Sequence, residues 1–232
     1  MPTTITFAEP ELTNVVLEAR QLLGDGLSND EQREPDRVSL GVCDPITLSA
    51  GNPQLEPDLA TFLAAHQDDR FVAAGFTCSF RPADDPITEC RLAIRLRRTE
   101  PGRATGDPVV WSVEPTMMHK PIERTVEIAL TAEAKYVLSA GASHNVTEKY
   151  TVDDCYLIST GKGESVAEWF FRPTTTVPKL EGMHDVRLVA RCPVGIPVTA
   201  DVLMSAKVRR RAAGLVPYRA VLPPQLSQIQ LG

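Results

Sequence analysis

Residues 197–211 read PVTADVLMSAKVRRR, and this stretch decides the fold class. Apolar residues occupy alternate positions along it: Val198, Ala200, Val202, Met204, Ala206 and Val208. The residues between them are polar, apart from Leu203. Because a β-strand turns successive side chains to opposite faces, this alternation predicts a half-buried strand and not a helix. The strand ends in three consecutive arginines.

Further runs of strand length follow from residue 70 onward. They cover residues 71–80, 89–97, 109–113, 124–132, 135–140, 146–152, 156–160, 166–171, 185–192 and 216–222, and an earlier short run covers 38–42. Loops at 161–165 and 193–196 each predict a hairpin. About ten strands without intervening helices are typical of an antiparallel sandwich or barrel. We predict a mainly β protein built on an antiparallel β-sandwich.

The chain divides into three parts by composition. Residues 1–69 form an acidic segment with two short helices, predicted at 9–23 and 57–66, where Pro10 and Pro57 suit first helical turns. Residues 70–224 form the β-sandwich domain, and residues 225–232 form a loose C-terminal tail. The first 69 residues hold three basic and thirteen acidic residues, a formal charge of −10, against +4 for the remainder. This asymmetry predicts an acidic surface that meets a basic one.

The cellular setting is predicted from what the sequence shows at its start and in its cysteines. The first residues carry neither a basic start nor an apolar core of a signal peptide. The five cysteines are scattered, without a paired motif, and so predict reduced core residues. We therefore expect a cytoplasmic protein, and the abundance of Ala, Val and Arg with few Lys is typical of bacteria with GC-rich genomes.

The basic residues are the best surface candidate. Lys207, Arg209, Arg210 and Arg211 end one predicted strand, and Arg95, Arg97 and Arg98 end another. Cations at every second strand position lie about 6.5–7 Å apart, which suits carboxylates of an acidic protein or successive phosphates. The acidic total and the lack of interleaved aromatic residues argue against nucleic acid.

Other candidates carry weaker signals. Cys155 with His144 or His119, oriented by Asp153 or Asp154, would form a nucleophile and base pair, but nothing in the sequence brings them together. The four histidines lack the spacing of a zinc site, so we predict neither a metal nor a cofactor. Trp169 and Phe171 share one face of a strand and predict core packing.

Three functional hypotheses follow. The first is a non-enzymatic interaction or self-assembly module, in which the acidic segment meets the basic strand edge of a protein partner or another copy. The second is an enzyme with a non-local Cys/His site, which we favour less. The third is binding of nucleic acid or a membrane surface through Arg209, Arg210 and Arg211.

Overall fold

The computed structural model describes residues 7–19, 33–52, 57–99, 106–129, 145–211 and 214–231, with backbone only for 119–129 and 145–154. Strands dominate it. They are β1 (Thr13–Ala19), β2 (Arg33–Val42), β3 (Ile46–Leu48), β4 (Asp69–Phe80), β5 (Ile87–Arg98), β6 (Val109–Glu114), β7 (Met117–Ala129), β8 (Asn145–Thr160), β9 (Val166–Phe171), β10 (Gly182–Pro193), β11 (Val198–Arg210), β12 (Gly214–Val221) and β13 (Gln228–Gln230). The described helices are α2 (Pro57–Ala65) and α3 (Pro224–Ser227).

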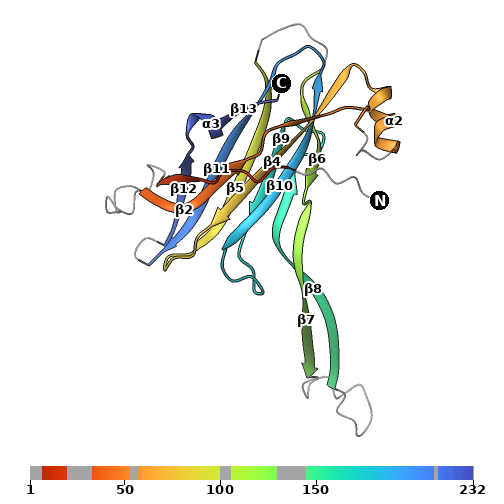
Figure 1. The fold of residues 1–232 in the computed structure, drawn as a ribbon. Helices are drawn as coiled ribbons and strands as arrows, with labels where there is room; N and C mark the ends of the chain where they lie inside the picture. The colour runs from red at the N-terminus through yellow and green to blue at the C-terminus, as the bar shows by residue number, and fades with distance from the viewer. Residues whose placement is uncertain are drawn as a thin grey trace.

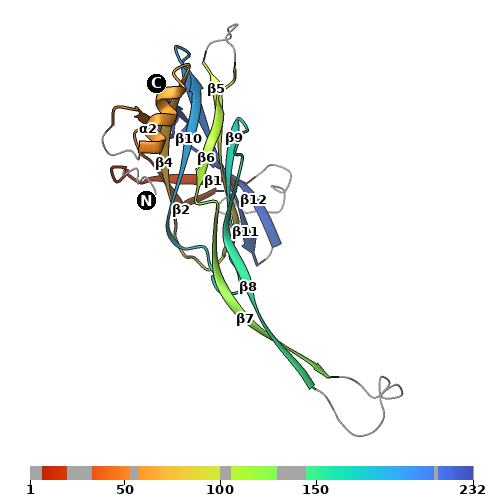
Figure 2. The same cartoon turned by 90° about the vertical axis from the view of Figure 1, so that its right-hand side faces the viewer.

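All of these strands belong to one antiparallel sheet. Its order is β6-β10-β4-β2-β1-β12-β11-β5-β9-β8-β7, with β3 beside β4 and β13 beside β11. The β8–β9 turn bridges the two ends, because the amide of Val110 donates to the Glu164 carbonyl at 2.8 Å and that of Gly163 donates to the Val110 carbonyl at 2.7 Å. The sheet is thus nearly closed into a barrel (Figures 1 and 2). The mainly β prediction is confirmed, but the sandwich is replaced by a barrel-like sheet.

The alternating apolar residues of β11 fill the inside of this barrel. The six alternate apolar residues of β11, from Val198 to Val208, are each 3% exposed or less. Trp169 and Phe171 on β9 are fully buried, as predicted, and the Phe171 ring packs edge-on against Phe80 at 5.3 Å. The core is therefore made by inward-facing positions of many strands curling around one another.

The prediction for the acidic segment is wrong in one helix and right in the other. Residues 57–65 form α2, but β1 occupies most of the stretch expected to be the first helix. β1 lies between β2 and β12 in the sheet and buries Val15 and Leu17. Backbone partners that are distant in sequence satisfy its hydrogen-bonding groups, and these outweigh the local helix pattern. Residues 13–19 and 33–42 therefore belong to the sheet.

Two further predictions are corrected. Residues 193–196 connect β10 to β11, but these strands pair with other neighbours, so the connection crosses the barrel and is not a hairpin. The tail is not loose, because β13 pairs with β11 and buries Ile229, and Leu231 is 1% exposed. The strand expected at residues 135–140 lies outside the described residues.

Candidate functional site

The β7–β8 hairpin leaves the barrel and extends far beyond it (Figures 1 and 2). β7 has 13 residues and β8 has 16, and they pair from Met117 opposite Ile158 to Ala129 opposite Asn145, with a register shift between Met118 and His119 that leaves Tyr156 as the extra residue. β8 pairs with β9 only from Leu157 to Thr160. Across the described residues, the remainder of β8 and all of β7 have no other strand partner. A two-stranded ribbon of about 40 Å therefore stands outside the body.

Residue types alternate along this ribbon. Two cross-strand pairs of positions hold apolar residues, with Ile122 opposite Val152 and Ile128 opposite Val146. The positions of opposite parity hold polar pairs, including Glu123 opposite Thr151 and Glu127 opposite Thr147. Positions two apart on a strand share a face, so the apolar pairs lie on one face of the ribbon, together with Arg124, Glu148 and, nearest the barrel, Lys120 opposite Asp154. The other face is mostly polar.

The ribbon meets the barrel at an aromatic junction. Tyr156 is the last residue of β8 before the pairing with β9 begins, and its ring lies 6.2 Å from that of His184 on β10. The His184 ring also lies 5.6 Å from Phe80 and 5.7 Å from Phe171. Burial lowers the pKa of His184, although the Glu181 carbonyl and the Asp185 carboxylate partly oppose this. The hairpin is thus anchored through a largely apolar contact.

The basic residues lie on the outer face of central strands. β11 is flanked by β12 and β5, so these cations are not at a sheet edge. Most have acidic partners: Lys207 pairs with Glu89 at 2.9 Å, Arg97 with Asp201 at 2.9 Å, and Arg98 with Asp107 at 3.1 Å. Arg95, Arg209 and Arg211 are exposed. Whether this set binds a partner stays a prediction.

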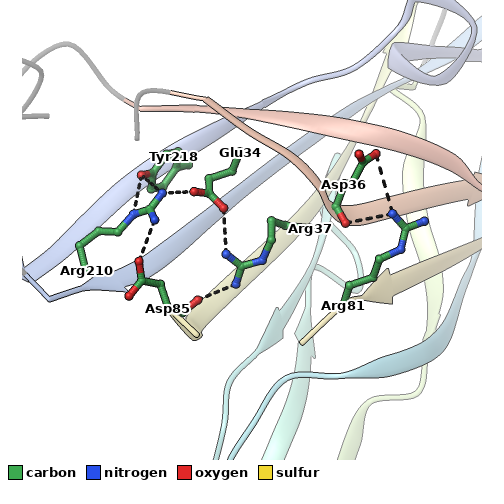
Figure 3. Close-up of polar contacts among 7 residues, drawn as sticks. All are labelled: Glu34, Asp36, Arg37, Arg81, Asp85, Arg210 and Tyr218. Atoms are coloured by element: carbon green, nitrogen blue, oxygen red, sulfur yellow. Dashed lines mark hydrogen bonds and ion pairs between the residues drawn. The ribbon is translucent and has the colours of Figure 1, made fainter. Parts of the chain in front are cut away.

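Arg210 differs from its neighbours because it points into the protein (Figure 3). It is 9% exposed and contacts Glu34 on β2, Asp85 at 2.8 Å in the β4–β5 connection, and the Tyr218 hydroxyl at 3.2 Å. Burial opposes its charge, but the hydrogen bonds to Asp85, Tyr218 and Glu34 outweigh burial and raise its pKa further. Arg37 extends the network to Glu34 at 2.8 Å. Arg210 therefore ties strands together and is not a free surface cation.

The Cys/His hypothesis gains one backbone observation. The register places His119 opposite Cys155, whereas His144 lies outside the described residues. Cys78, Cys90 and Cys192 are buried as predicted, and burial raises the pKa of the Cys78 thiol to about 12. In the described part of the chain, no group of three or more His, Cys, Asp or Glu residues could hold a metal ion. Among the described helices, none has the length and apolar character to cross a membrane.

The comparisons with known proteins come from solved structures. The membrane-inserted form of the Clostridium perfringens NetB toxin matches with a TM-score of 0.28 and 7% identity over 95% of this chain and 94% of that chain. A pore forming protein matches with a TM-score of 0.30 and 8% identity over 88% of this chain and 92% of that chain. No family model matches the sequence, and no curated protein does. Structural matches at this TM-score and identity do not assign a family or a function to this chain.

Sequence reasoning missed the projecting hairpin as a site. It predicted a strand at 124–132, which overlaps β7 up to Ala129, and a strand at 146–152, which lies inside β8, but treated both as ordinary members of the sheet. Residues 130–132 lie outside the described residues. The available signal was the alternation of residue types over a run longer than an average strand. The residues of β7 and β8 do not indicate where the neighbouring strand β9 ends. The sequence therefore does not predict that the hairpin projects from the barrel.

Proposed function

We propose that the protein self-assembles by edge-to-edge pairing of β7–β8 hairpins from neighbouring copies, and that the assembled hairpins cross a lipid bilayer as a pore. The observation that carries this is the length of ribbon whose outer edges have no strand partner among the described residues. Isolated two-stranded ribbons are marginal in water, and free strand edges are templates for pairing with another chain. Such a role needs no catalytic centre.

Edge pairing of this kind propagates and can close. β7 of one copy pairs with β8 of the next, so every added copy presents the same two edges again. This is a head-to-tail contact, which generates a ring when the rotation between copies closes. Closure removes every free edge, as a membrane interior requires of strands, because lipid offers no hydrogen-bond partner to backbone groups.

The alternation of residue types supports a bilayer as the surrounding medium. In the sequence, every even-numbered position from 126 to 140 is apolar: Val126, Ile128, Leu130, Ala132, Ala134, Tyr136, Leu138 and Ala140. The odd-numbered positions between them are mostly polar. Membrane-spanning strands need about 9–11 residues with apolar residues toward lipid and polar residues toward the lumen. β7 has 13 residues and so reaches that length, and it contains the start of this run, residues 126–129. Lys120 and Arg124 have the same parity, so the apolar positions assigned to lipid begin at Val126.

A pair of lysine substitutions tests the proposal. Ile128→Lys places a charge at a position assigned to lipid, which costs about 2–4 kcal/mol per copy at mid-bilayer, whereas Ala129→Lys adds the same charge at a position assigned to water. We expect release of a vesicle-entrapped dye by the wild type and by Ala129→Lys, and at least a tenfold slower release by Ile128→Lys.

Two results would contradict this expectation. One is no dye release by the wild type on any vesicle, and the other is equal loss in both lysine variants. Chemical cross-linking on vesicles reports assembly separately. Oligomers held by strand pairing persist at high salt, whereas assembly through the acidic segment and the basic face is screened, so oligomers that dissolve in salt support that alternative.

A further inference from the structure

We infer that the end of the barrel from which the hairpin emerges binds an anionic lipid surface through Arg172, Lys179, Arg209 and Arg211. This inference rests on the proposed function, because it assigns the surface on which the assembled hairpins insert.

The register shows that three connections share one end of the barrel with the hairpin. Phe171, the last residue of β9, lies opposite both Leu157 on β8 and Cys90 on β5. Cys90 in turn lies opposite Ala206, shortly before β11 ends. Phe80, the last residue of β4, pairs with Gly182 at the start of β10. Residues 81–86, 172–181 and the β11–β12 turn therefore lie at the end where β8 leaves the body.

In the described connections at this end, basic residues outnumber acidic ones, although the net charge of the protein is −6. Arg81 and Arg210 are bound to acidic residues, to Asp36 and to Glu34 with Asp85 respectively. Within the described residues, the four cations named above are exposed and have no carboxylate within ion-pair distance. The carboxylates left unpaired in the same connections are those of Asp84 and Glu181. An excess of cations therefore remains available to a partner.

The opposite end of the barrel has the opposite sign. Its described connections carry Asp68 and Glu164 against Lys162, while Asp107 there is paired with Arg98 at 3.1 Å. Asp68 accepts from the amide of Val194 through its carbonyl, which places the α2–β4 and β10–β11 connections together there. A negatively charged surface thus attracts one end and repels the other. The attraction orients the barrel with its hairpin toward the surface.

An apolar side chain accompanies the cations. Leu215 lies opposite Arg209 in the β11–β12 ladder and is 53% exposed. A shallow hollow of about 360 Å³ adjoins it, lined by the three arginines of the turn and by Asp84, Asp85 and Pro86. Arginines that flank an exposed leucine suit the headgroup region of a bilayer, where the charges meet phosphate and the leucine reaches the acyl boundary.

Vesicle co-sedimentation tests the inference with the full chain. The vesicles are phosphatidylcholine alone, or phosphatidylcholine with about a third phosphatidylserine. We expect tighter binding of the wild type to the anionic vesicles. Each basic residue near such a surface strengthens binding about fivefold, so Arg209→Gln/Arg211→Gln should weaken it by about 25-fold. The matched control, Lys162→Gln/Arg219→Gln, removes the same charge elsewhere on the barrel and should bind as the wild type does.

The outcomes separate this inference from the proposed function. If both double variants lose binding equally, or neither does, the arginines of the turn are not the lipid site and the inference is overturned, whether or not dye is released. If binding follows the expected pattern but no dye is released, the inference stands and the pore proposal fails. A wild type that binds a DNA oligonucleotide but does not bind anionic vesicles would assign the surface to nucleic acid. That result would also overturn the inference.

Discussion

At the scale of single residues, Arg210 shows how one charge changes its role with depth. Its neighbours Arg209 and Arg211 are exposed, whereas Arg210 reaches inward to Glu34 on β2, to Asp85 in the β4–β5 connection and to the Tyr218 hydroxyl on β12 (Figure 3). Removing one partner from a buried ion pair leaves an uncompensated charge and costs about 3–5 kcal/mol. We therefore expect Arg210→Met to lower the free energy of unfolding by that amount in urea titrations.

Arg209→Met is the matched control for that substitution. Arg209 is exposed, so its replacement should change the free energy of unfolding by less than about 0.5 kcal/mol. Equal effects of the two substitutions would mean that the network around Arg210 does not hold the strands together.

His184 gives the junction of barrel and hairpin a pH dependence. Burial lowers its pKa in the folded protein below the value of 6.5 that the unfolded chain has. The unfolded state thus binds a proton first as the pH falls. The stability that neutral His184 contributes is full above pH 6.5 and is lost as the pH falls through the folded pKa.

We expect the wild type to lose more unfolding free energy than His184→Phe does between about pH 7.5 and about pH 5.5. Phe suits the site because the neighbouring rings of Phe80, Phe171 and Tyr156 are aromatic. Urea titrations of both proteins at the two pH values measure this difference. An identical pH dependence in His184→Phe would contradict the assignment.

At the scale of elements, the local sequence pattern predicted where strands lie better than it predicted which strands pair with each other in the sheet. Strict alternation along β11 and the aromatic spacing of β9 identified the inward faces correctly, because burial of alternate residues is a property of one strand. β1 was missed because Val15, Val16 and Ala19 suit a helical stripe as well as a strand. The backbone partners that decide between them lie on β2 and β12, far away in sequence.

The candidate site was likewise predicted only in part from the sequence. The strands were predicted in part, and so were the basic residues of the β11–β12 turn. The predicted strand 166–171 matches β9, but the sequence pattern does not show that β8 extends beyond β9, or that Arg210 turns inward between its exposed neighbours. Both features depend on contacts between segments more than ten residues apart, and the periodicity within one segment does not indicate such contacts.

At the scale of the whole molecule, the barrel and the hairpin are separable in their contacts. The core holds residues from β1 to β13, and among the side chains that the structure describes it reaches the hairpin through Tyr156 and Leu157. Closure of the barrel is made by the β8–β9 turn on β6, at the end away from the hairpin. The folding of the barrel should therefore not require the projecting ribbon.

Replacing residues 120–153 with a short Gly-Ser turn tests this separation. Because the core and its closure are retained, we expect a folded protein whose melting temperature is within about 4 °C of the wild type, a shift of roughly 1 kcal/mol or less. The shortened protein should keep its preference for anionic vesicles, since the β11–β12 turn is intact, but form no cross-linked oligomers and release no dye. A shortened protein that still assembles and releases dye would move the assembly surface to the barrel itself.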